Sequence, residues 1–156
     1  MAVLAYFGGL RRSEAVLATV GGLDGATFTF WRPKVRNWHA VGLPPEPVAV
    51  LEAWIRAERS RRPMNRRSLL FVSQKGGALS GGHLARILRR ACLEAGIPSL
   101  KAHSHVLRRS RATHLLEASD GDYRLAQAAL GHKSVSTTEA YLCSNREADL
   151  MRRYGL

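Results

Sequence analysis

The sequence has few cysteines, no long apolar runs and few acidic residues, and each of these absences excludes some classes of protein. Its two cysteines, Cys92 and Cys143, lie far apart and form no Cys-x-x-Cys pattern. A secreted disulfide scaffold is therefore disfavoured, and reduced thiols are expected. No apolar stretch approaches the ~18 residues that span a bilayer, and the N-terminus has no signal-peptide pattern. These absences predict a cytoplasmic protein without a membrane partner.

The shortage of acidic residues leaves a strong positive charge. Lysine and arginine total 24 against 12 aspartate and glutamate residues, which gives a net charge of +12 and a pI near 11.0. Arginine accounts for 20 of these cations, and its planar guanidinium matches phosphate oxygens better than the ammonium of lysine does. A field of this sign attracts polyanions and favours nucleic acid as the partner, although a merely basic protein is the alternative on charge alone.

Residue patterns predict one domain over residues 1–156, mainly α-helical with a small antiparallel β-sheet, which is an α+β fold. The chain has 156 residues, 46% of them hydrophobic, and shows no repeat or linker. Alternating aromatic and β-branched residues predict strands at 26–31 and 38–43, joined as a hairpin. A short extended piece is predicted at 69–73. Helices are expected at 1–7, 10–18, 46–60, 80–95, 105–118, 123–130, 137–143 and 145–153.

The apolar spacing also predicts which helical side chains are buried, and one basic segment is predicted to be exposed. Segment 56–67 holds six arginines and is interpreted as a solvated, flexible loop in preference to a phosphate contact. Ser136 and Glu139 have the spacing of a capping box, which would start the helix that carries Tyr141. The side chains expected in the core of these helices are Leu10, Val16, Leu17, Val50, Leu51, Trp54, Ile55, Leu84, Ile87, Leu88 and Cys92.

Five short segments carry residue types suited to phosphate chemistry. Arg11 follows a glycine turn at the start of a helix, and Lys34 lies at the tip of the hairpin. His105 and Arg108 are three apart and share a helical face. His132 directly follows a predicted helix end. The segments are GLRRSE (9–14), RPKVRN (32–37), HVLRR (105–109), LGH (130–132) and STTEAY (136–141).

In this order the segments resemble the tyrosine site-specific recombinases, the phage integrase family. The resemblance covers nearly the whole chain, from Arg11 to Tyr141, with His132 and Tyr141 nine positions apart. It implies the catalytic-domain fold of that family, and DNA cleavage and rejoining through a 3′-phosphotyrosyl intermediate without a metal or other cofactor. It also implies two partners: double-stranded DNA and further recombinase subunits, assembled as a tetramer on DNA. The setting would be bacterial, phage or mobile-element DNA at the nucleoid.

Cleavage of a phosphodiester without a metal requires cations that offset charge on the non-bridging oxygens. Arg11 and Arg108 can supply this charge through two hydrogen bonds each, and His132 can add another. The resemblance implies that Glu14 orients Arg11. Further contacts to DNA are expected from Arg12, Arg36, Arg109 and Lys133.

Strand cleavage also requires groups that move protons. A tyrosine with a pKa of ~10 is mostly protonated at neutral pH, so its attack needs a nearby base. The resemblance implies that Tyr141 is the nucleophile and that His105, which suits the base role by its chemistry, accepts its proton. Lys34 is implied as the general acid that protonates the leaving 5′-oxygen.

Family members usually carry further catalytic-domain helices and a separate DNA-clamping domain before the GLR motif. The resemblance therefore implies a catalytic domain that is truncated at its N-terminus and lacks the core-binding domain, either excised or left by a mobile element. Weak DNA binding with little sequence preference is expected, since many phosphate and base contacts would be missing. Exposed apolar surface near the N-terminus is predicted to favour self-association. The residues of this predicted patch are Val3, Leu4, Tyr6 and Phe7.

Other assignments remain open at this point. One is a non-catalytic DNA-binding remnant with intact motifs, and another is a type IB topoisomerase-like enzyme, which shares the same chemistry. The LGH and STTEAY segments and the short length favour the recombinase. A zinc site is disfavoured because four candidate ligands follow no familiar zinc spacing. These ligands are His103, His105, His132 and Cys143.

Overall fold

The computed structural model describes residues 1–131, and of Ser104 it describes the backbone alone. The chain divides into two compact units, Met1–Arg108 and Arg109–Leu156. The helices predicted at 137–143 and 145–153, and the capping box that would start the first of them, lie outside the described residues.

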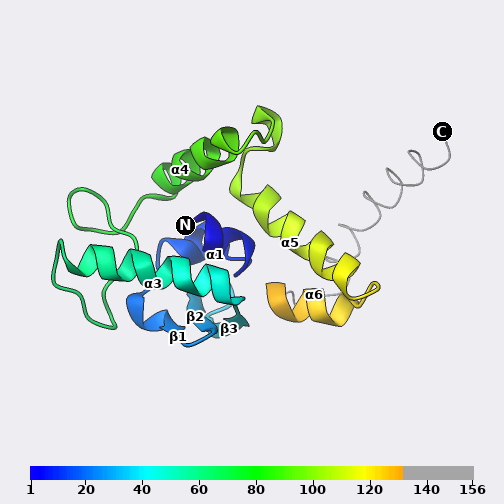
Figure 1. Cartoon of the computed structure of the whole chain (residues 1–156), viewed down its shortest axis with the longest axis horizontal. Coiled ribbons are helices and arrows are strands. Elements are labelled where there is room, and N and C mark those ends of the chain that lie inside the picture. The colour runs from blue at the N-terminus through cyan, green and yellow to red at the C-terminus, as the bar shows by residue number, and fades with distance from the viewer. Residues whose placement is uncertain (132–156) are drawn as a thin grey trace. The chain divides into compact units, whose positions relative to one another are not determined.

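The first unit combines several helices with one small sheet, so the predicted fold class is confirmed. α1 packs against α2 and α3, and α2 packs against α4 and β2 (Figure 1). Short 3-10 turns occur at Val20–Gly22 and Ser99–Lys101. The elements are α1 (Ala2–Tyr6), α2 (Arg12–Ala15), β1 (Leu23–Asp24), β2 (Thr27–Arg32), β3 (Asn37–Gly42), α3 (Pro45–Arg59), α4 (Gly81–Glu94) and the first turn of α5 (Ser104–Ala118).

The sheet is antiparallel with the strand order β1-β2-β3. Phe28 pairs with Val41, and Phe30 pairs with His39. Phe28, Phe30 and Val41 are buried, so this face of the sheet forms part of the core. The predicted strands are confirmed with a shift of about one residue at each end. The two-residue strand β1 was not predicted from the sequence, because so short a piece carries no alternation.

The core joins this sheet face to the helices. Leu51 and Ile55 of α3 are buried, as are Leu84, Leu88 and Cys92 of α4. Four other side chains were wrongly predicted to be buried, and each is adjacent in sequence to another residue of the predicted core. The exposed ones are Leu17, Val50, Trp54 and Ile87.

The exposed apolar residues of α3 and α4 have a common physical reason. Helices α3 and α4 bury a stripe only one residue wide at each turn, through i and i+4 positions, so a neighbour on the flank reaches solvent. Trp54 illustrates the flank position. Its indole Nε1 donates to the Leu70 carbonyl at 3.0 Å, and its ring lies 5.9 Å from that of Phe71. It therefore packs at the rim of the core.

The predicted apolar patch at the N-terminus needs one correction. Leu4 is 0% exposed, and Val3 and Phe7 pack against the core with part of their surface covered. The cause is a chain reversal after α1, in which the Leu10 N–H donates to the Leu4 carbonyl at 3.1 Å. This bond brings Leu4 and Leu10 into the same core.

The basic segment 56–67 makes more contacts with the rest of the fold than a solvated, flexible loop would make. Its first four residues belong to the last turn of α3. Glu58, which is buried, accepts from Arg61 Nη1 at 3.3 Å and from Arg62 Nε at 3.2 Å. Arg62 also donates to the Leu69 carbonyl at 3.1 Å. Most of the segment is exposed, as predicted, but Glu58 is buried and Arg62 is partly buried, because their contacts tie the segment to the end of α3 and to Leu69.

The described part of the second unit contains the rest of α5 and α6 (Tyr123–Leu130). Asp122 caps α6 by accepting from the N–H groups of Arg124 at 2.8 Å and Leu125 at 3.3 Å. Gly131 ends the helix in the left-handed region with φ 57°. Over residues 1–131, no helix is long and apolar enough to cross a bilayer.

Candidate functional site

Two glycines set the direction of the chain at Arg11. A Cβ on Gly8 would lie 2.6 Å from Leu10 Cδ1 and 2.8 Å from the Leu4 carbonyl oxygen, so no larger residue fits there. Gly9 has φ 59°, which favours glycine. The tight turn sends Leu10 into the core and leaves Arg11 at the start of α2 with its side chain 30% exposed.

The Glu14 carboxylate binds both the backbone and the side chain of Arg11. Its Oε2 accepts from the Arg11 backbone N–H at 2.7 Å, which is one half of a capping box. Its Oε1 lies 3.0 Å from Arg11 Nη1. Glu14 is only 2% exposed. The arrangement is the one expected of a residue that orients Arg11, although its role in catalysis stays a prediction.

Arg108 reaches the same turn from a distant part of the chain. It lies in the first turns of α5, is 4% exposed, and its Nη1 donates to the Gly9 carbonyl. Gly9 stands two residues before Arg11, so this bond brings the second predicted phosphate-binding arginine to the loop that carries the first. A buried arginine is costly unless its guanidinium is paired or hydrogen-bonded.

His105 lies beside Arg11 in an open cavity of about 430 Å³. The cavity is also lined by Arg12, Ser13 and His103. The structure thus brings the predicted base and one predicted cation to a single solvent-accessible space. Arg12, predicted to contact DNA, is exposed at its edge.

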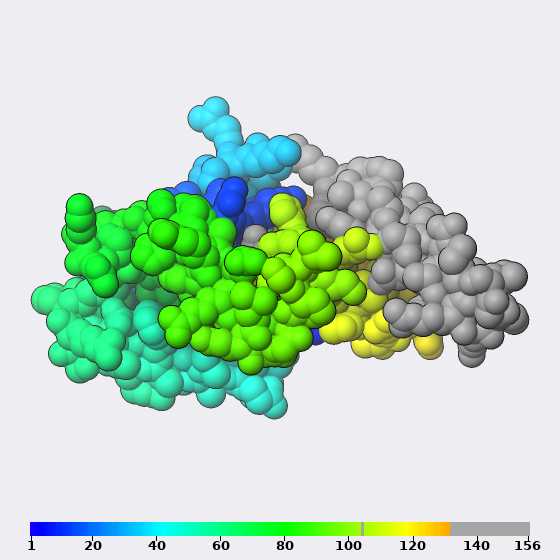
Figure 2. Space-filling model, turned by 90° about the horizontal axis from the view of Figure 1, so that it is seen from above, coloured from blue at the N-terminus to red at the C-terminus, as the bar shows by residue number. Residues whose placement is uncertain are grey.

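Lys34 is exposed in the four-residue turn between β2 and β3. This turn projects from the surface, in light blue in Figure 2. The Arg32 carbonyl closes it by accepting from Val35 N–H at 3.3 Å and Arg36 N–H at 2.8 Å. Arg36 completes the turn in the left-handed region with φ 53°. The predicted position of Lys34 at a hairpin tip is confirmed, and its role as an acid remains a prediction.

The backbone of Arg36 and its charge can be tested separately. Asparagine tolerates the left-handed region and valine does not, so Arg36→Val should lower the free energy of unfolding by about 1–2 kcal/mol and Arg36→Asn by much less. Both remove one cation, and we expect both to weaken DNA binding and to reduce the salt slope by about 1. Thermal unfolding and DNA titrations at two salt concentrations measure these effects. Equal unfolding temperatures for the two variants would contradict the strain argument.

Arg32 is a buried charged residue beside Glu14 that the sequence analysis missed. It is 5% exposed, and its Nε lies 3.6 Å from Glu14 Oε1. Burial lowers the pKa of the Arg32 guanidinium below its ordinary value, while the neighbouring Glu14 charge acts in the opposite direction. The signal was present in the alternation of β2, because Phe28, Phe30 and Arg32 are two apart and therefore share the inner face. The predicted strand ended one residue before Arg32.

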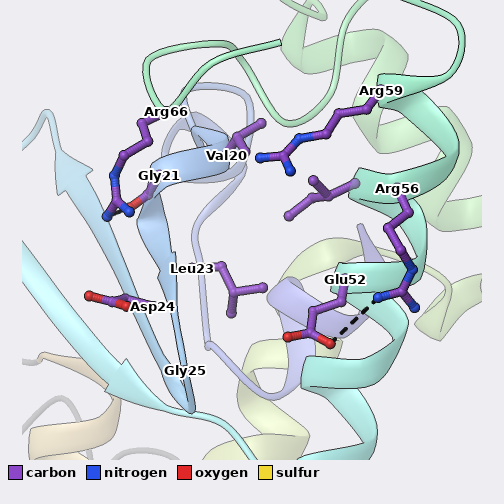
Figure 3. Close-up of a pocket in the computed structure, with 10 residues that line it drawn as sticks. Val20, Gly21, Leu23, Asp24, Gly25, Glu52, Arg56, Arg59 and Arg66 are labelled. Carbon is purple, nitrogen blue, oxygen red and sulfur yellow. Dashed lines mark hydrogen bonds and ion pairs between the residues drawn. The ribbon is translucent and has the colours of Figure 1, made fainter.

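A second hollow lies between the edge of the sheet and α3. It has a volume of about 330 Å³. Figure 3 shows Arg59 reaching into it from α3, whereas Arg56 turns to Glu52, 3.8 Å away. Arg66 closes one side by donating to the Gly21 carbonyl at 3.4 Å. The mixture of signs and the wide opening define no particular ligand.

Several predicted site residues are not placed. His132, Lys133 and Tyr141 lie outside the described residues, and so does Cys143. Arg109 belongs to the second unit and is partly buried. Within residues 1–131, no three His, Cys, Asp or Glu side chains come close enough together to hold a metal ion.

Comparison with known proteins identifies relatives of this chain. The family model described as the phage integrase family matches residues 1–148. Tyrosine recombinase XerC of Haemophilus ducreyi is 33% identical over 142 residues, which cover 90% of this chain and 45% of the relative. Tyrosine recombinase XerD of Oceanobacillus iheyensis is 39% identical over 145 residues, which cover 90% of this chain and 48% of the relative. The chain thus spans about half the length of these curated relatives.

Solved structures share the fold. The crystal structure of XerA recombinase has a TM-score of 0.77 and 29% identity, and the match covers 97% of this chain and 56% of that one. XerH site-specific recombinase, bound to its difH substrate in a pre-cleavage complex, has a TM-score of 0.72 and 31% identity. That match covers 90% of this chain and 40% of the XerH chain. The predicted catalytic-domain fold is therefore confirmed.

Proposed function

Because this chain belongs to the phage integrase family, we propose that it breaks and rejoins DNA strands through a covalent bond between Tyr141 and the 3′-phosphate. The observation that carries the proposal is the gathering of charged side chains at the turn before α2. Arg11 and Glu14 begin the helix, Arg108 binds the Gly9 carbonyl, and His105 lines the same cavity as Arg11. Phosphodiester cleavage requires such cations to stabilise the phosphate and such a base to accept a proton.

The cations act on the phosphate. As the nucleophile approaches, negative charge builds on the non-bridging oxygens, and fixed guanidinium groups stabilise it without reorganisation. Arg11 and Arg108 carry this role in the proposal, with His132 adding a hydrogen bond. Glu14 holds Arg11 at the helix start, so that the guanidinium is oriented before DNA arrives.

Protons and bonds balance in a metal-free cycle. The Tyr141 oxygen attacks phosphorus, its proton passes to His105, and the bond from phosphorus to the 5′-oxygen breaks. Lys34 gives a proton to that leaving oxygen. The phosphotyrosyl ester keeps the energy of the broken bond, so a 5′-hydroxyl from another strand can attack it and reverse the steps without ATP.

Double-stranded DNA is the substrate in this proposal. The solved XerH complex, 31% identical in sequence, holds its difH substrate before cleavage. The net charge of +12 supports the same partner. Assembly of several subunits on the DNA, as a tetramer, remains part of the prediction.

A covalent adduct is the direct test. The chain is incubated with nicked duplexes from which the cleaved fragment diffuses away, so that rejoining cannot occur. We expect a protein–DNA band that survives denaturation, and a tryptic peptide containing Tyr141 with a nucleotide attached, detected by mass spectrometry. An adduct on another residue would overturn the assignment of Tyr141. The absence of any adduct, even when a core-binding domain from a Xer recombinase is supplied, would contradict the function.

A further inference from the structure

Three of the four charged residues buried in residues 1–131 lie around one turn. Glu14, Arg32 and Arg108 are 2%, 5% and 4% exposed, and the fourth, Glu58, belongs to the end of α3. Arg11 and Arg108 already have places in the proposed chemistry. Arg32 has none, yet its burial carries a similar cost.

Glu14 is one carboxylate placed between two guanidinium groups. Its Oε1 lies 3.0 Å from Arg11 Nη1 and 3.6 Å from Arg32 Nε. Opposite charges this close in a buried setting interact strongly. Because the two arginines share one carboxylate, the interaction of Glu14 with each arginine is weakened by the presence of the other. The three groups together keep a net positive charge of one.

Exposure separates the two arginines. The Arg11 side chain is 30% exposed and lines the open cavity, so an anion can reach it. The Arg32 side chain is 7% exposed and points from the inner face of β2 toward Glu14. Arg32 can therefore influence a bound phosphate through Glu14, and Arg11 can bind it.

We propose that Arg32 is a positioning residue that shares the Glu14 carboxylate and so keeps the Arg11 guanidinium available to the scissile phosphate. The inference rests on the proposed function, in which Arg11 binds that phosphate. Arg32 is also the last residue of β2, and its carbonyl closes the turn that carries Lys34. One residue thus joins the two segments that hold Arg11 and Lys34.

A double-mutant cycle on the full chain tests this role without requiring cleavage. The four proteins are the unmodified chain, Arg32→Met, Glu14→Gln and the double variant. Inorganic phosphate is the probe, and the Nε–H signal of Arg11, assigned with an Arg11→Lys variant, reports binding by nuclear magnetic resonance. We expect Arg32→Met to weaken phosphate binding at Arg11 about 5- to 10-fold, and by less than about twofold when Glu14 is already glutamine.

Each other outcome overturns the proposal. If Arg32→Met weakened phosphate binding equally with glutamate and with glutamine at position 14, Arg32 would act as a distant cation and not through Glu14. Unchanged affinity in Arg32→Met, or no response of Arg11 to phosphate in the unmodified chain, would remove its premise. Circular dichroism and thermal unfolding verify that each variant folds.

A conservative variant covers the case in which Arg32→Met does not fold. Arg32→Lys keeps the charge and should bind phosphate within about twofold of the unmodified chain, whereas a tenfold loss would contradict the shared-carboxylate argument. The adduct assay remains independent. Coupling in the cycle without any adduct would reject the proposed function and keep the role of Arg32 toward Arg11, and an adduct without coupling would reject the role of Arg32 alone.

Discussion

Replacing Tyr141 with phenylalanine is expected to abolish the covalent adduct, with a loss of more than about 10³-fold in cleavage rate. The substitution removes one oxygen atom, which is the atom that attacks phosphorus in the cleavage step of the proposed mechanism. The two arginines and the overall charge remain, so the affinity for duplex DNA should stay within about twofold. A binding titration beside a denaturing gel separates these two effects.

Tyr123→Phe is the matched control, because it removes the same atom from another tyrosine. Tyr123 is partly buried at the first position of α6 and has no assigned role in the chemistry. Its variant should form the adduct at the rate of the unmodified chain. If Tyr141→Phe still formed an adduct, another nucleophile would have to be sought. If both variants lost it, the effect would lie in folding rather than in chemistry.

Within residues 1–131, the sequence predicted the local setting of the motif residues better than it predicted which neighbouring apolar side chains are exposed. Arg11 lies far from His105 and Arg108 in the chain, yet the order of the five segments indicated the family. Each of these residues needs a particular local structure, such as a glycine turn or a shared helical face. Such structures require particular residue types at a fixed spacing, which can be recognised in the sequence. The structure places Arg11 and Arg108 at the same turn through the Gly9 carbonyl.

Partners of a buried charge leave no comparable signal. Arg32 and Glu14 stand 18 positions apart, and nothing in the spacing couples them. A charged residue at a strand end is usually solvated, so its burial depends on a carboxylate that tertiary structure supplies. The exposed Val50 and Trp54 have a similar explanation. Helical periodicity indicates a face, but the width of the buried stripe depends on which elements pack against it.

Arg108→Met is the second substitution with a large expected effect, and its effects on catalysis and on stability should differ. Cleavage should fall about 10²- to 10³-fold, as when one preorganised donor to a developing anion is removed. The free energy of unfolding should change by less than about 2 kcal/mol. An apolar side chain of similar size avoids the cost of burying a charge, which offsets the loss of the donor to the Gly9 carbonyl.

Two further variants make the comparison decisive. Arg108→Ala should lose cleavage to the same extent but also lower the free energy of unfolding by about 2–5 kcal/mol, because it leaves a cavity at a residue that is 4% exposed. Arg56→Met removes a cation from the exposed side of α3, where Arg56 pairs with Glu52, and should leave cleavage unchanged. Single-turnover cleavage and chemical denaturation measure both quantities. Cleavage that followed stability across the three variants would mean that Arg108 serves the fold. Cleavage lost equally in the methionine and alanine variants, with stability lost in alanine alone, would mean that the charge is kept in the core for the phosphate.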